Sequence, residues 1–205
     1  MANLKETLLN PIFKGNPITV LVLGICSSLA VTVQLKGALV MALSVTIVTG
    51  LSSLVVSMMR KSIPNRIRII VQLVVVSLMV ILVDQVLKAY AYSISKTLSV
   101  YVGLIITNCI VMGRIEAFAL SNKPVPSLLD GLANGAGYGM ILIIVAFFRE
   151  LLGSGTLLGF RVIPEAFYTA GYMNNGLVIL PTMALILLGC IVWVQRSIQK
   201  DLQEK

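Results

Sequence analysis

Six apolar segments divide this chain, and two of them are too short to cross a lipid bilayer alone. The short segments are residues 18–33 and 100–113, and the long ones are residues 38–59, 67–86, 132–148 and 177–193. A helix needs about 20 apolar residues to cross the hydrocarbon core. The long segments therefore predict membrane-spanning helices. The short ones predict half-helices, whose broken ends must be buried by protein or line a cavity.

Composition supports the membrane class. Charged residues make up only 12% of the 205 residues, and hydrophobic residues make up 58%. A soluble domain carries about 25% charged residues. The net charge of +8 does not indicate nucleic acid binding, because the basic residues flank the apolar segments instead of forming one face. No cleavable signal peptide is expected, since the first fifteen residues are polar and mixed.

The segments follow the same order in each half of the chain, one short segment and then two long ones. The first half covers about residues 15–95 and the second about residues 98–197. Three segments per half make the second half enter the membrane from the opposite side, so the order predicts two inverted repeats. We expect an all-α integral membrane protein with six segments in a single membrane domain, residues 1–205.

Basic residues predict the orientation. In a six-segment topology, most of the Lys and Arg residues lie on the side that holds both termini. The strongest group lies between the second and third segments, and its members are Arg60, Lys61, Arg66 and Arg68. Cytoplasmic loops carry an excess of Lys and Arg. Both termini are therefore predicted to be cytoplasmic.

Each short segment carries one cysteine, Cys26 in the first and Cys109 in the second. Thiolates suit iron, iron–sulfur clusters, zinc or copper. The chain has three cysteines and no histidine, whereas an iron–sulfur cluster usually needs four ligands. Cys26 and Cys109 are therefore predicted to be metal ligands, with a partner chain donating the others. Alternatively, both thiols pack as small hydrophobic side chains, which is our expectation for Cys190.

Charged residues near the ends of the long segments have simpler interpretations. Asp84 and Lys88 are spaced as an i,i+4 ion pair. Asp130 and Asn134 lie where the fifth segment begins, so we expect them to cap a helix whose dipole favours an acid there. The pair Arg149–Glu150 is expected to anchor the far end of that segment.

Glycines add two local predictions. Gly131, Gly135 and Gly139 are four residues apart and form a stripe that lets two membrane helices approach closely. Residues 153–156, Gly-Ser-Gly-Thr, predict the turn that ends the fifth segment.

Four stretches of the chain resemble the signatures of one protein family. They are residues 23–26, 65–69, 103–119 and 148–155. On these residues the chain resembles the family that comprises the D-type subunit of the Na⁺-translocating NADH:quinone oxidoreductase and the E-type subunit of the Rnf ferredoxin:NAD oxidoreductase complex. The quinone reductase is the first choice, and the Rnf complex is the close alternative.

The resemblance implies a shared metal centre. In this family, the D-type subunit and the similar E-type subunit of the same enzyme pack as an inverted pair, and each offers two cysteines to a single iron or a [2Fe–2S] cluster. The matching positions here are Cys26 and Cys109. The resemblance further implies a six-subunit complex in the bacterial inner membrane that couples NADH oxidation by ubiquinone to Na⁺ export. Flavin and NADH sites lie in other subunits, so this chain would relay electrons without a complete active site.

Two other functions fit parts of the same pattern. A secondary transporter also uses inverted repeats with broken helices, but it would place polar or charged residues at the breaks, where this chain has cysteines. A structural membrane scaffold would leave Cys26 and Cys109 as packing residues. It predicts that Cys26→Ser or Cys109→Ser leaves activity and iron content intact.

Overall fold

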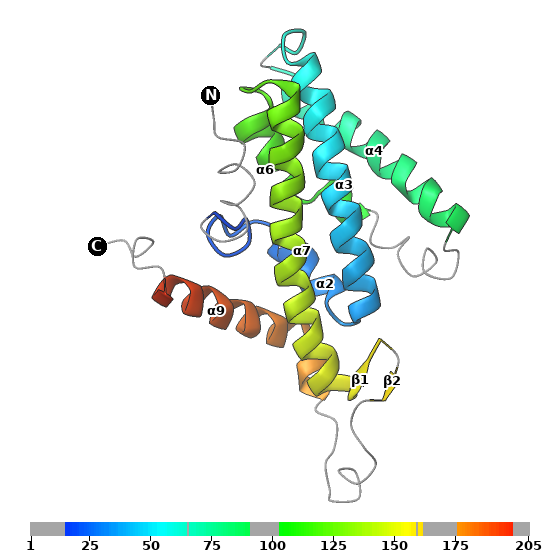
Figure 1. The fold of residues 1–205 in the computed structure, drawn as a ribbon, viewed down its shortest axis with the longest axis vertical. Helices are drawn as coiled ribbons and strands as arrows, with labels where there is room; N and C mark the ends of the chain where they lie inside the picture. The colour runs from blue at the N-terminus through cyan, green and yellow to red at the C-terminus, as the bar shows by residue number, and fades with distance from the viewer. Residues whose placement is uncertain (1–14, 65, 91–102, 159, 162–175, 199–205) are drawn as a thin grey trace, which may run out of the picture.

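Four long helices dominate the computed structural model, which describes residues 15–64, 66–90, 103–158, 160–161 and 176–198 (Figure 1). The long helices are α3 (Leu35–Met59), α4 (Arg68–Tyr90), α7 (Pro124–Ser154) and α9 (Pro181–Ile198). Each is long and apolar enough to cross a membrane. They confirm the four long segments predicted from the sequence, and the chain is a helical membrane protein.

Short elements connect the long helices. They are α2 (Ile25–Val31), α6 (Cys109–Arg114), the π-helix η1 (Ile115–Ala119), the 3₁₀ helix η2 (Gly176–Ile179), and the two-residue strands β1 (Thr156–Leu157) and β2 (Phe160–Arg161). The antiparallel strand pair departs from the all-α prediction. It follows Gly155, which adopts a left-handed conformation at the end of α7. This glycine confirms the predicted turn, because it adopts a positive φ without steric cost.

The centre of the fold is the antiparallel pair of α3 and α7, which lie side by side in Figure 1. The predicted glycine stripe of α7 faces α3. A Cβ atom on Gly131 would lie 2.8 Å from the carbonyl oxygen of Thr49, and one on Gly135 would lie 2.6 Å from the Cα of Thr46. Real Cβ atoms do not approach other atoms this closely. The stripe is therefore confirmed as the surface on which the two helices meet.

This contact predicts that Gly135→Ala destabilises the protein by about 1–3 kcal/mol, the usual cost of overpacking. The added methyl group meets backbone of α3, which cannot rotate away as a side chain can. The free energy of unfolding in detergent measures the effect. Gly189→Ala is the matched control, since a Cβ atom on this α9 glycine has nothing within 4 Å. Equal stability of the two variants would contradict the close approach.

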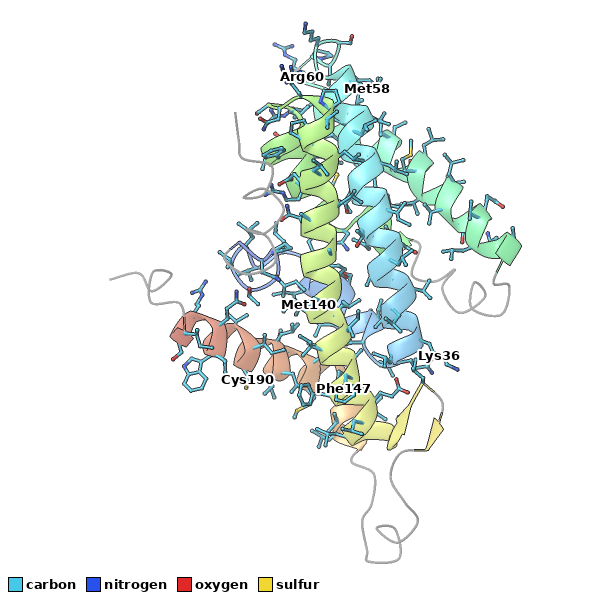
Figure 2. All side chains as sticks on the ribbon, in the orientation of Figure 1. Lys36, Met58, Arg60, Met140, Phe147 and Cys190 are labelled. Atoms are coloured by element: carbon cyan, nitrogen blue, oxygen red, sulfur yellow. The ribbon has the colours of Figure 1, made fainter. Side chains whose placement is uncertain are left out.

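The other two long helices lie outside this pair. In the most apolar stretch of α4 only 22% of residues are buried, and in α9 only 11%, against 61% in α7. Figure 1 shows α9 diverging from α7 after its first turns, and Figure 2 shows Cys190 on the diverging part. A cavity of about 660 Å³ lies between the two helices, with Cys190 on its wall. The expectation that Cys190 is packed is wrong within this chain, because the divergence leaves it exposed.

Candidate functional site

The first short segment is broken directly before its cysteine. Gly24 adopts a left-handed conformation (φ 81°) at the N-cap of α2, so that the helix begins at Ile25 and Cys26 lies in its first turn. Glycine takes this conformation without the steric cost that a Cβ atom brings. The left-handed glycine therefore stops any helix from running through the whole segment, and α2 itself ends at Val31.

The second short segment is also broken directly before its cysteine, here by an extended residue. Residues 103–106 are helical, and the chain becomes extended at Asn108, so that Cys109 is the first residue of α6. The side-chain oxygen of Asn108 accepts a hydrogen bond from the backbone N–H of Ile110, at 3.2 Å. Asparagine is among the preferred N-cap residues for this reason. Both cysteines therefore lie at the tips of short helices, where the sequence analysis placed them.

The two breaks contact each other across the fold. A Cβ atom on Gly24 would lie 2.5 Å from the Cδ1 of Ile110, and one on Gly113 would lie 3.0 Å from the Cδ1 of Leu23. The side-chain amide of Asn108 donates a hydrogen bond to the hydroxyl of Ser27, at 3.3 Å. Ser27, which follows Cys26, is thus hydrogen-bonded to Asn108, which precedes Cys109.

The two thiols are exposed although their neighbours are buried. Ser27 and Asn108 are each 3% exposed, whereas Cys26 and Cys109 both lie on the surface of the chain. Within the described residues no group of three or more His, Cys, Asp or Glu side chains could hold a metal ion. A metal ion held by these two thiols would therefore need further ligands from outside the described residues.

The sequence did not predict a role for one buried residue of this region. Tyr138 of α7 is fully buried, and its hydroxyl lies 2.7 Å from the hydroxyl of Ser27. The two residues are 111 positions apart. The only signal in the sequence is an aromatic residue with a polar group inside a glycine-rich apolar segment, and this signal does not identify the partner.

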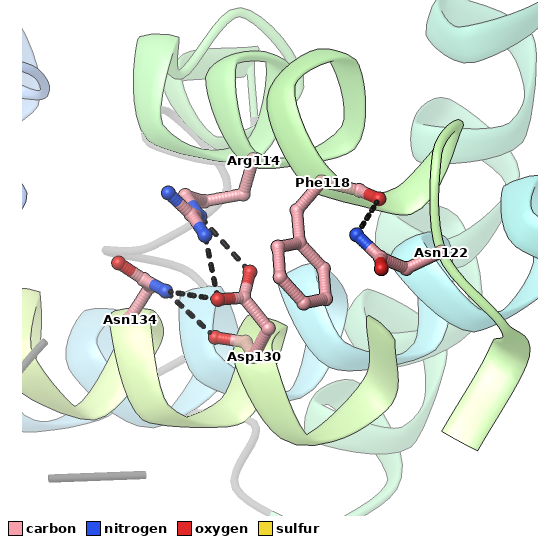
Figure 3. Close-up of polar contacts among 5 residues, drawn as sticks. All are labelled: Arg114, Phe118, Asn122, Asp130 and Asn134. Atoms are coloured by element: carbon pink, nitrogen blue, oxygen red, sulfur yellow. Dashed lines mark hydrogen bonds and ion pairs between the residues drawn. The ribbon is translucent and has the colours of Figure 1, made fainter. Parts of the chain in front are cut away.

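A second polar cluster joins α6 to α7 (Figure 3). The guanidinium of Arg114 donates two hydrogen bonds to the carboxylate of Asp130, at 2.9 and 2.5 Å, and Asn134 donates to the same carboxylate at 3.1 Å. The predicted capping role of Asp130 is wrong. The helix begins earlier, at Pro124, so Asp130 lies in its second turn and binds a side chain instead of the helix end.

Each acidic residue in the described part of the chain has a partner. Asp84 pairs with Lys88 at 2.6 Å, as predicted. Glu116 pairs with Arg68 at 2.5 Å, and Glu150 accepts a hydrogen bond from the backbone N–H at the start of α3, at 2.6 Å. Asp84 pairs within α4, whereas Glu116 and Glu150 join different elements of the fold. Cys26 and Cys109 remain exposed free thiols.

The fold and the two exposed thiols define a class, namely helical membrane proteins that present one cysteine in the first turn of each of two contacting short helices. Comparison with known families places the chain more closely. The family described as "Rnf-Nqr subunit, membrane protein" matches residues 4–192. The chain therefore belongs to the Rnf-Nqr family of membrane subunits, as its resemblance predicted.

Two curated relatives carry the same name, which identifies each as the D-type subunit of a Na(+)-translocating NADH-quinone reductase. The protein from Pseudomonas paraeruginosa (strain DSM 24068 / PA7) is 55% identical over 97% of this chain and 89% of its own length. The protein from Haemophilus influenzae (strain PittGG) is 57% identical over 98% of this chain and 97% of its own length. The likeness thus covers nearly the whole of each protein.

Proposed function

We propose that this chain is the D-type subunit of a Na⁺-translocating NADH:quinone reductase and that Cys26 and Cys109 are ligands of an iron centre shared with a homologous membrane protein of the same complex. The relatives at 55–57% identity support the quinone reductase over the Rnf alternative. The observation that carries the metal-binding role is that both thiols are exposed at tips whose neighbouring residues are bonded together. A transporter site would need free polar groups at the breaks, and cysteines occupy them.

The donor set fits half of such a centre. Two thiolates suit iron or a [2Fe–2S] cluster, and a cluster usually needs four protein ligands. A second subunit with the same two short helices, inverted in the membrane, would provide the other two and would cover the exposed thiols. When bound, the centre would supply a one-electron relay inside the membrane, coupled in the complex to Na⁺ export.

The chain's own residues have defined tasks in this proposal. Cys26 and Cys109 bind, and the bond between Ser27 and Asn108 orients the two tips. Ile110, which is fully buried, packs against Gly24 and so holds the first break against the second. The remaining parts of the proposal are two inverted three-helix repeats, cytoplasmic termini, and a six-subunit inner-membrane complex that oxidises NADH with ubiquinone through flavins in other subunits.

The test is the content of iron and acid-labile sulfide in the purified complex. Cys109→Ala is expected to remove the iron while the complex still assembles, since one exposed thiol does not replace two. Loss of sulfide together with iron would identify a cluster, whereas iron loss alone would identify a single iron. The matched control is Cys190→Ala, which removes the exposed thiol of α9 and should leave iron unchanged. Wild-type iron in Cys109→Ala would overturn the proposal.

A further inference from the structure

We propose that Tyr138 is a positioning residue that holds the two cysteine-bearing tips in one arrangement. This inference rests on the proposed metal-binding function of Cys26 and Cys109. Its basis is a hydrogen-bonded group in which the Ser27 hydroxyl contacts both Tyr138 of α7 and Asn108. Tyr138 thereby connects the tips to the central helix pair.

The hydrogen bonds define which atoms donate. The Ser27 hydroxyl has one proton, and it donates this proton to the carbonyl oxygen of Gly24, at 3.0 Å. The amide nitrogen of Asn108 can only donate. For all three bonds to form, Tyr138 must therefore donate to Ser27 as well. Ser27 then makes the one donated and two accepted bonds that a hydroxyl can make.

Buried contacts fix the position of the Tyr138 side chain. Its side chain is fully buried, and its ring would lie 3.2 Å from a Cβ atom on Gly24. The preceding carbonyl, that of Gly137, accepts a hydrogen bond from the buried side chain of Asn16, at 3.1 Å. The helix that carries Tyr138 packs along α3 through the glycine stripe. Tyr138 is therefore anchored in the central helix pair.

The tips need such support because they are short. The helix α2 has seven residues, and α6 has six and runs directly into the five residues of η1, whereas isolated helices below about 12–15 residues are marginal. Their orientation must therefore come from tertiary contacts. Residues that orient metal ligands typically contribute about 10–100-fold to metal affinity. Tyr138 acts through Ser27 and Asn108, each adjacent in sequence to a cysteine, and is expected to contribute in this range.

The experiment measures the rate at which the purified complex releases iron to an excess of a ferrous chelator. Tyr138→Phe, which removes only the hydroxyl, is expected to release iron about 10–100-fold faster than wild type. Ser27→Ala removes the acceptor of the same bond and should act in the same direction. Thr49→Val is the matched control, because its buried hydroxyl bonds only within its own helix, to Val45 at 2.6 Å. This control should release iron at the wild-type rate.

A double-mutant cycle separates positioning from general loosening. If Tyr138 acts through Ser27, the variant with both Tyr138→Phe and Ser27→Ala should release iron no faster than the faster single variant. Additive effects of residues in contact would indicate independent structural roles and would overturn the inference. Wild-type release from both single variants would also overturn it, while loss of iron in Cys109→Ala would leave the proposed function standing. Iron retained in Cys109→Ala would overturn both.

Discussion

Asp130→Ala is expected to lower the free energy of unfolding by about 3–5 kcal/mol, the cost of leaving a buried charge without its partner. The side chain of Asp130 is 4% exposed and that of Arg114 is 17% exposed. Two hydrogen bonds from the guanidinium, together with one from Asn134, occupy the carboxylate. Its removal leaves the guanidinium buried beside α7. The pair also joins α6, which carries Cys109, to the central helix pair.

Unfolding of the detergent-solubilised complex, followed by helical circular dichroism, measures this effect. The matched control is Asp84→Ala, whose partner Lys88 is 44% exposed on the same helix. Such i,i+4 pairs contribute about 0.2–0.5 kcal/mol. The double variant Arg114→Met with Asp130→Leu should recover most of the stability, because replacing both charges removes the desolvation cost. An Asp130→Ala variant as stable as Asp84→Ala would contradict the buried pair.

Arg149→Met is expected to destabilise the protein by about 3–6 kcal/mol, because two short bonds to a charged donor contribute about 1.5–3 kcal/mol each. The Arg149 side chain is buried, with 1% of the residue exposed. It donates at 2.5 Å to the hydroxyl of Thr32, directly after α2, and at 2.5 Å to the carbonyl of Ile179 in η2. One guanidinium thereby ties the end of α2 to the segment that leads into α9.

Limited proteolysis locates the part of the chain that is destabilised in Arg149→Met. Without Arg149, η2 loses the hydrogen bonds that tie it to Thr32 at the end of α2, so cleavage near residues 176–181 should accelerate in Arg149→Met. Arg149→Lys should be intermediate, since an ammonium group lacks the planar fork that reaches several acceptors. The matched control is Arg60→Met, because Arg60 makes one exposed hydrogen bond, to Ser121 at 3.1 Å. If Arg60→Met accelerated this cleavage as much as Arg149→Met does, the proposed role of Arg149 would be refuted.

Hydropathy was sufficient for the parts of the fold that depend on local sequence. The long helices follow from uncharged apolar runs, because a backbone inside a membrane must satisfy its own hydrogen bonds. The turn at Gly155 and the stripe that includes Gly135 were also predictable, since a left-handed conformation and a close helix contact both require the absence of a Cβ atom. Sequence also placed Cys26 and Cys109 on the two short segments.

Tertiary packing decided the rest. The contacts of Tyr138 with Ser27, of Arg114 with Asp130 and of Arg149 with Thr32 join residues 111, 16 and 117 positions apart. No local periodicity encodes such pairs, because a buried donor donates its hydrogen bond to whichever acceptor the folded chain brings near it. For this reason Asp130 was mistaken for a cap. Apolar runs specify which segments enter the membrane, whereas the arrangement of the polar groups between them depends on how the helices meet.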